Sequence, residues 1–247
     1  MDINVKNQFI QDWKKYFNNP ELPVTFYYAD HPENAEIAKP SGKWECIICR
    51  LQSVRRGKSL AFDEKAVRCA GGKRYIGFTS KIRPEFEYFL SCGIPGRMEG
   101  ERYIRTPEMV KELMKNQKHL DKKGKYIVFK RWDKLEEYDN PDVAIFFATP
   151  DVLSGLFTLA NFDQTEPNGT FSPFGSGCGS AIHYPYLEKD SVRPRAVIGM
   201  FDPSARPCVP AGVLTYSVPM VKLLKMISYM DESFLITDSW KKVQKRI

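Results

Sequence analysis

The chain has 247 residues, of which 43% are hydrophobic and 13% aromatic, enough for one large domain or two small ones. Its formal net charge is +7, and the positive charge follows no known nucleic-acid-binding motif. The longest apolar stretch, residues 143–162, is interrupted by Pro150 and Asp151, so no membrane span is expected. Composition therefore disfavours an integral membrane protein, makes nucleic acid an unlikely partner and favours small anionic ligands.

The first half of the chain alternates between helical and extended patterns. Residues 2–18 carry apolar side chains at helical spacing and predict an amphipathic helix. Residues 24–29 are rich in β-branched and aromatic residues and predict a buried strand. The next expected elements are a polar loop at 31–43, a helix at 46–56, a strand at 60–62, a helical turn at 64–69, a tight turn at Gly71-Gly72 and a strand at 74–78.

The second half contains two clear helix starts. Thr106-Pro107-Glu108 combines a capping threonine with proline at the first helical position, and Thr149-Pro150-Asp151 repeats the pattern. Residues 163–177 predict a long loop, which in a compact domain is often functional. The remaining expected elements are strands at 125–132, 143–148, 196–201 and 214–218, and helices at 178–187 and 219–230. This mixture predicts a single α+β domain over residues 1–247, with a mixed β-sheet packed by helices.

Four of the six cysteines are the most informative residues of the chain. Cys46 and Cys49 are three positions apart on a predicted helix, so their side chains share one face. Cys69 and Cys178 each lie beside a glycine-rich segment. Thiolates are ligands for zinc and for iron–sulfur clusters, and they are also nucleophiles. The pattern leaves open a metal site, unreactive buried thiols and a reactive thiol. A thioredoxin-like pair is least favoured, because no suitable strand directly precedes the two cysteines.

The glycine-rich segments also suit an anion site. The expected helix start at Cys178 would direct backbone N–H groups and the positive end of the helix dipole at a ligand. Arg206 follows a predicted strand, and its guanidinium could bind a carboxylate or phosphate or could pair with Asp202. The alternative is that these residues only form tight turns. The candidate ligand-binding residues are Gly71, Gly72, Gly177, Gly179, Ser180, Asp202 and Arg206.

Four segments, residues 49–57, 69–77, 177–181 and 198–207, resemble one prokaryotic family, known as domain of unknown function 169. The resemblance covers roughly residues 20–230, which leaves an N-terminal amphipathic helix over 1–19 and a basic C-terminal helix over 231–247. It implies that Cys49, Cys69 and Cys178 occupy family cysteine positions. Met200 stands where many members have a further cysteine, so either Cys46 or Cys208 replaces that ligand in a four-cysteine site or the fourth position stays open. The family has no established activity.

These observations favour a cysteine-ligated metal or iron–sulfur protein with a redox role on a small anionic molecule. Its expected ligands are Cys46, Cys49, Cys69 and Cys178, and its expected cofactor is an iron–sulfur cluster or zinc. The alternative is a non-catalytic binding module for a small anionic metabolite. Residues 1–20 show no secretory signal, so we expect the cytoplasm, reduced thiols and few disulfides. The sequence does not decide whether the protein is an enzyme.

Overall fold

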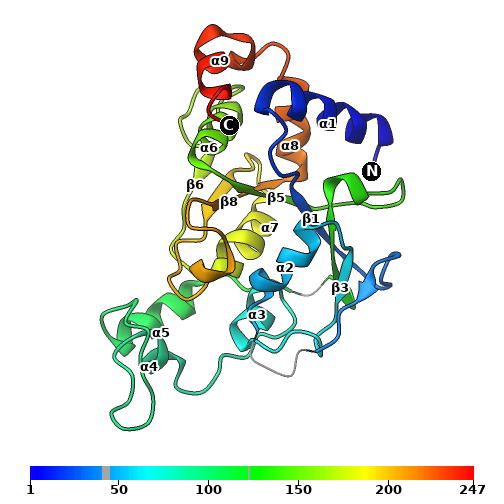
Figure 1. Ribbon diagram of the computed structural model, residues 1–247. Helices are drawn as coiled ribbons and strands as arrows, with labels where there is room; N and C mark the ends of the chain where they lie inside the picture. Colours follow the sequence, from blue (N-terminus) through cyan, green and yellow to red (C-terminus); the bar gives the residue numbers. More distant parts are fainter. Residues whose placement is uncertain (41–44, 122) are drawn as a thin grey trace.

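The computed structural model describes residues 1–40, 45–121 and 123–247 (Figure 1). The strands are β1 (Val24–Ala29), β2 (Glu36–Ile37), β3 (Leu60–Phe62), β4 (Tyr126–Arg131), β5 (Val143–Ala148), β6 (Thr170–Phe171), β7 (Ala196–Gly199) and β8 (Leu214–Pro219). They form one eight-stranded sheet in the order β2-β3-β4-β1-β5-β8-β7-β6. The pairs β2–β3 and β6–β7 are parallel and the other neighbours are antiparallel, so the sheet is mixed, as predicted.

Helix α1 precedes the first strand, and the other helices lie between and after the strands. The α-helices are α1 (Ile3–Phe17), α2 (Ile47–Arg55), α3 (Ala70–Tyr75), α4 (Phe86–Leu90), α5 (Pro107–Asn116), α6 (Pro150–Ala160), α7 (Tyr184–Glu188), α8 (Met220–Ser228) and α9 (Asp238–Gln244). The shorter helical segments are η1 (Trp132–Lys134), η2 (Gly179–His183), η3 (Arg206–Cys208) and η4 (Phe234–Ile236); η2 has π-helical hydrogen bonding. Within the described residues, no helix has the length and apolar character needed to span a bilayer.

Each face of the sheet has its own hydrophobic core. Val143, Ile145 and Phe147 of β5 pack with side chains of α2, α3, η2 and α7. Ala144 and Phe146, on the other face, pack with α1, α6, α8 and α9. Because successive side chains of a strand point to opposite faces, one buried strand contributes to both cores, which explains its continuous apolar sequence. Helices on both faces of one sheet confirm the predicted α+β domain (Figure 1).

The sequence predictions were wrong in one region that matters for the site. Residues 74–78 were expected to form a strand, but α3 occupies residues 70–75. The helix begins here because the Cys69 sulfur accepts a hydrogen bond from the Gly72 N–H at 3.3 Å. Gly71 and Gly72 therefore lie in the first turn of a helix and do not form a separate tight turn.

Two predicted loops contain short strands. The expected loop at 31–43 includes β2, and its residues 41–43 lie outside the described residues. The expected loop at 163–177 includes β6, which pairs with β7 at the sheet edge. In both loops, pairing with a distant strand overrides a local sequence that is rich in polar and turn-forming residues.

Candidate functional site: a cysteine centre

Three free cysteines occupy equivalent local positions in the fold. Cys46 is the N-cap residue of α2, Cys69 that of α3 and Cys178 that of η2. An N-cap side chain lies beside backbone N–H groups that have no partner within the helix. At Cys46, the nearby N–H groups of Ile48 and Cys49 lower the pKa of the thiol in part, although the Cys46 side chain makes no capping hydrogen bond. Each of these sulfurs is thus placed by the start of a helical segment on the same side of the sheet.

The three thiols lie in one electrostatic neighbourhood. Negative charge on Cys69 and Asp202 raises the pKa of Cys46, and charge on Cys46, Cys69 and Asp202 raises that of Cys178, in each case after the larger effect of burial. The chain segments also contact one another closely. A Cβ atom added to Gly177 would lie 2.9 Å from the Met200 sulfur and 3.6 Å from the Ile48 side chain on α2. Segments separated by more than 100 residues therefore converge on one centre.

A disulfide joins two further cysteines at this centre. Cys49 on α2 is bonded to Cys208 on η3 with an S–S distance of 2.01 Å, although 159 residues separate them in sequence. The bond is one of the few disulfides that the sequence allowed, and it pairs Cys208 with a residue of the predicted ligand set. While the bond exists, Cys49 cannot serve as a thiolate ligand. Among the residues that the structure describes, no three His, Cys, Asp or Glu side chains are arranged to share a metal ion.

Burial raises the pKa of two of the free thiols, those of Cys46 and Cys178. Cys178 is buried, and burial raises the pKa of its thiol far above the ordinary value, although the Ser176 hydroxyl at 3.3 Å lowers it in part. Burial likewise raises the pKa of Cys46, against the effect of the two N–H groups. A metal would displace these protons, because thiolate and not thiol is the ligand form. Cys46 and Cys178 are therefore neutral thiols at neutral pH.

The amides predicted to bind an anion are used within the protein. The Gly177 N–H donates to a carboxylate oxygen of Asp202 at 3.1 Å. The Gly179 N–H donates to the Ser176 hydroxyl at 3.0 Å, and the Ser180 N–H donates to the Ser176 carbonyl at 3.0 Å. These glycines and Ser180 therefore shape the turn that presents Cys178, and the predicted ligand-binding role of their amides is not supported by their contacts.

Arg206 also has a structural role. Its guanidinium donates to the main-chain carbonyls of Val213 at 2.6 Å and Ala211 at 2.7 Å, and thereby holds the turn that follows η3. Among the described residues, its guanidinium makes no hydrogen bond to Asp202. The Asp202 carboxylate instead accepts hydrogen bonds from Gly177 and from the Ser204 hydroxyl at 2.9 Å. The anion-binding role of Arg206 stays a prediction, and its carbonyl contacts leave the guanidinium fewer free N–H groups for a ligand.

Sequence reasoning missed one residue beside the centre and understated another. His183 ends the π-helical segment and is 2% exposed, yet within the described part of the chain neither ring nitrogen makes a hydrogen bond of normal geometry. Burial lowers its pKa to about 4.

Met200 is fully buried with a positive φ of 70°, a strained conformation for a residue with a side chain, and its N–H donates to the Ser180 hydroxyl. π-helical turns and strained residues are frequent at functional sites.

Comparison with known proteins gives one result. The sequence matches the family model described as uncharacterised ArCR, DUF169, over residues 14–229. No curated protein and no solved structure shows significant similarity to the chain. The match covers β1 to α8 and all six cysteines, and it leaves the start of α1 and the C-terminal α9 outside.

Proposed function

Since the chain belongs to the uncharacterised DUF169 family, we propose its function from the cysteine centre: it is a cysteine-ligated iron–sulfur or zinc protein. The proposed ligands are Cys49, Cys69 and Cys178, with Cys46 or Cys208 as the fourth. The observation that carries the proposal is the convergence of five cysteines from four separate chain segments on one side of the sheet. Buried thiols are costly to ionise, and a bound metal cation compensates for that cost.

Reduction of the disulfide comes before metal binding. A dithiol reductant supplies two electrons and two protons to the Cys49–Cys208 bond, which yields two thiols while the reductant becomes a disulfide. Cys49 then lies one helical turn from Cys46 on α2, on the face already occupied by the other thiols. The disulfide form is the metal-free state of the same centre, and the cytoplasm is the proposed location because its thiol pool favours the reduced state.

The proposed reaction partner is a small anionic molecule. If only Cys49, Cys69 and Cys178 bind the metal and no fourth cysteine does, one coordination position stays open for this molecule, as in catalytic metal sites. The net charge of +7 attracts anions to the protein. The alternative, an anion-binding module without a metal, has less support, because the Arg206 guanidinium and the amides of Gly177 and Gly179 are occupied by other groups of the protein.

The test is metal analysis and visible spectroscopy on protein purified without oxygen and with a dithiol reductant. We expect stoichiometric iron with sulfide and broad thiolate-to-iron absorption, or one zinc per chain without colour. Cys69→Ser and Cys178→Ser should each lower the metal content at least tenfold. Cys92→Ser is the matched control, because Cys92 is exposed and bonds only to its own loop.

The same samples identify the fourth ligand and can refute the proposal. Loss of metal in Cys46→Ser but not in Cys208→Ser assigns Cys46, and the reverse assigns Cys208. Reduced wild-type protein that stays free of iron and zinc after reconstitution would contradict the proposal. A Cys178→Ser variant that retains full metal content would remove Cys178 from the ligand set and contradict the convergence argument.

A further inference from the structure

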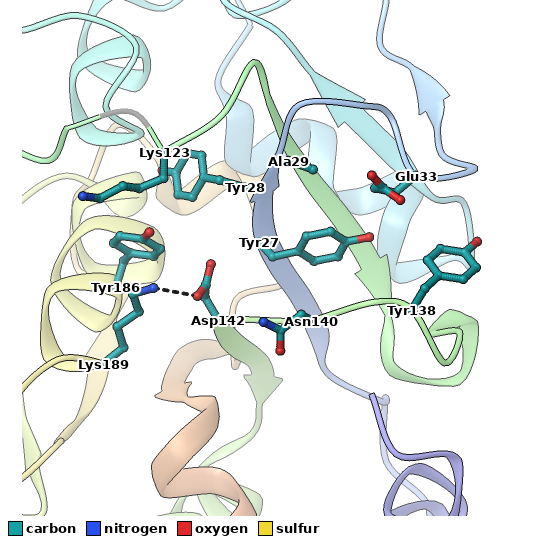
Figure 2. A pocket seen from close by; sticks show the side chains of 10 residues that line it. All are labelled: Tyr27, Tyr28, Ala29, Glu33, Lys123, Tyr138, Asn140, Asp142, Tyr186 and Lys189. Carbon is teal, nitrogen blue, oxygen red and sulfur yellow. Dashed lines mark hydrogen bonds and ion pairs between the residues drawn. The ribbon is translucent and has the colours of Figure 1, made fainter.

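A polar cavity of about 400 Å³ lies where two central strands separate (Figure 2). β1 pairs with β5 from Val24 to Phe26 and continues beyond this point paired with β4 on its other side. The edge of β1 that is left open borders the cavity, together with the residues that precede β5 and the C-terminal end of α7. The lining residues are Tyr27, Tyr28, Ala29, Glu33, Lys123, Tyr138, Asn140, Asp142, Tyr186 and Lys189.

Tyrosine rings form fixed walls of the cavity. The Tyr28 hydroxyl donates to the Ile76 carbonyl at 2.8 Å, and the Tyr27 hydroxyl donates to the buried carboxylate of Asp139. Tyr186 packs edge-on against Tyr28, with ring centroids 5.1 Å apart. Because hydrogen bonds and ring contacts fix these side chains, their faces are presented to a ligand without further ordering on binding.

The two ends of the cavity differ in charge. Figure 2 shows Lys123 and Lys189 with Tyr186 on one side, and Glu33 with Tyr27 and Tyr138 on the other. Such a division gives the cavity a positive end and a negative end. A ligand with a single charge would meet a charge of its own sign at one of these ends.

Asp142 lies between the two ends. Its carboxylate accepts a hydrogen bond from Lys189 Nζ at 2.7 Å and another from the Tyr28 backbone N–H. Burial raises its pKa above the ordinary value even though Lys189 lowers it. Lys189 and Asp142 thus neutralise each other. Among the described residues, Lys123 and Glu33 form no ion pair, and they lie at opposite ends of the cavity.

We propose that this cavity binds a zwitterionic metabolite of the amino-acid class. Its carboxylate would lie toward Lys123, beside the Lys189–Asp142 ion pair, and its ammonium toward Glu33, where the ring of Tyr27 also attracts a cation. The volume is within the range of small-molecule sites and accommodates an amino acid with a large side chain. The aromatic walls supply apolar surface for that side chain. This inference is independent of the metal centre.

The test is calorimetric titration of the full-length protein with the twenty common L-amino acids. Each amino acid that binds is compared with its decarboxylated amine and its deaminated acid; for L-phenylalanine these are phenethylamine and 3-phenylpropanoate. We expect at least one amino acid to bind and both analogues to bind at least tenfold more weakly. Failure of all twenty would overturn the proposal, and equal binding of either singly charged analogue would overturn the zwitterion assignment.

Two charge-removing variants locate the site. Glu33→Gln and Lys123→Gln should each weaken binding of the amino acid at least fivefold, because each removes the charge at one end that has no ion-pair partner in the cavity lining. The matched controls are Glu112→Gln and Lys225→Gln, at exposed positions on α5 and α8 outside the cavity lining. Unchanged binding in both pocket variants, with folding verified by circular dichroism, would show that the ligand binds elsewhere and would overturn the proposal.

Discussion

The two faces of the sheet differ in the kinds of side chain that they bury. The face covered by α1, α6, α8 and α9 is packed by large rings, and Trp13 stacks on Phe17 and contacts Phe9 and Phe146. None of the cysteines belongs to this core. Such packing of apolar rings, with little polar surface, is typical of a core that serves stability.

The opposite face carries groups that stability alone does not favour. Near β7 and β8 it presents Gly199 and the buried hydroxyls of Thr215 and Ser217, for which the described structure shows no hydrogen-bond partner. Buried thiols, the π-helical segment and the buried ring of His183 lie over these residues. Unsatisfied buried polar groups lower the free energy of unfolding. We infer that the polar groups buried on this face, the cysteine face, lower the stability that its hydrophobic core provides.

Removal of the disulfide on the cysteine face should change the free energy of unfolding most. A Cys49→Ser/Cys208→Ser variant should lose about 2–4 kcal/mol of unfolding free energy relative to the oxidised, metal-free protein, because the bond closes a long loop in the unfolded chain. Urea denaturation without reductant measures this difference. Cys92→Ser should leave the midpoint unchanged. Equal stability of the double variant and the wild type would show that the bond does not form in solution.

Lowering the pH should lower the free energy of unfolding through His183, which lies on the cysteine face. The unfolded ring binds a proton near pH 6.5, whereas the folded ring binds one only near pH 4, because burial lowers its pKa. Between these values the unfolded state binds more protons, so stability falls as the pH falls, by up to about 3 kcal/mol for this group.

Substitution of the histidine isolates this contribution. His183→Phe, which keeps a ring beside Tyr75 and Tyr184, should remove this part of the acid sensitivity when unfolding is measured from pH 7 to pH 4. The control is His31→Gln, because His31 is exposed. If the His183 variant and the wild type lose equal stability over this pH range, His183 is not the buried neutral group described above.

Two glycine substitutions, one on each face of the sheet, should give the smallest effects on stability. They test whether a change on one face leaves the other unaffected. A Cβ on Gly199 would lie 2.1 Å from the Ser180 hydroxyl oxygen, and one on Gly155 would lie 2.4 Å from the Trp240 ring. Each alanine variant should therefore lose about 1–3 kcal/mol by overpacking. Gly199→Ala displaces η2 and should also speed alkylation of Cys178, whereas Gly155→Ala should not. Equal alkylation rates in the two variants would contradict the separation of the faces.

The sequence was most informative where local chemistry decides the structure. The apolar residues of β1 and β5 predicted strands, and Thr106 before Pro107 predicted the start of α5. The Thr106 hydroxyl accepts a hydrogen bond from the Met109 N–H, as a capping residue does. The strand expected at 74–78 failed because a cysteine sulfur caps a helix there, a capping role outside the usual set of residues.

The rest of the site depends on contacts between residues far apart in the sequence. No spacing rule pairs Cys49 with Cys208 across 159 residues. The main-chain carbonyls that hold Arg206 become acceptors only after the turn following η3 has formed. The tyrosine cavity exists because β1 extends beyond its pairing with β5, and this register follows from tertiary packing.

The most direct test of the account is the metal content of the purified chain before and after reduction of the Cys49–Cys208 bond. Samples are prepared without oxygen, incubated with iron and sulfide or with zinc, freed of unbound metal and analysed. The account predicts no tightly bound metal in the oxidised protein and one zinc ion or one cluster per chain in the reduced protein. Reduced protein that binds no metal, while Cys178 and its neighbours titrate as free thiols, would contradict it.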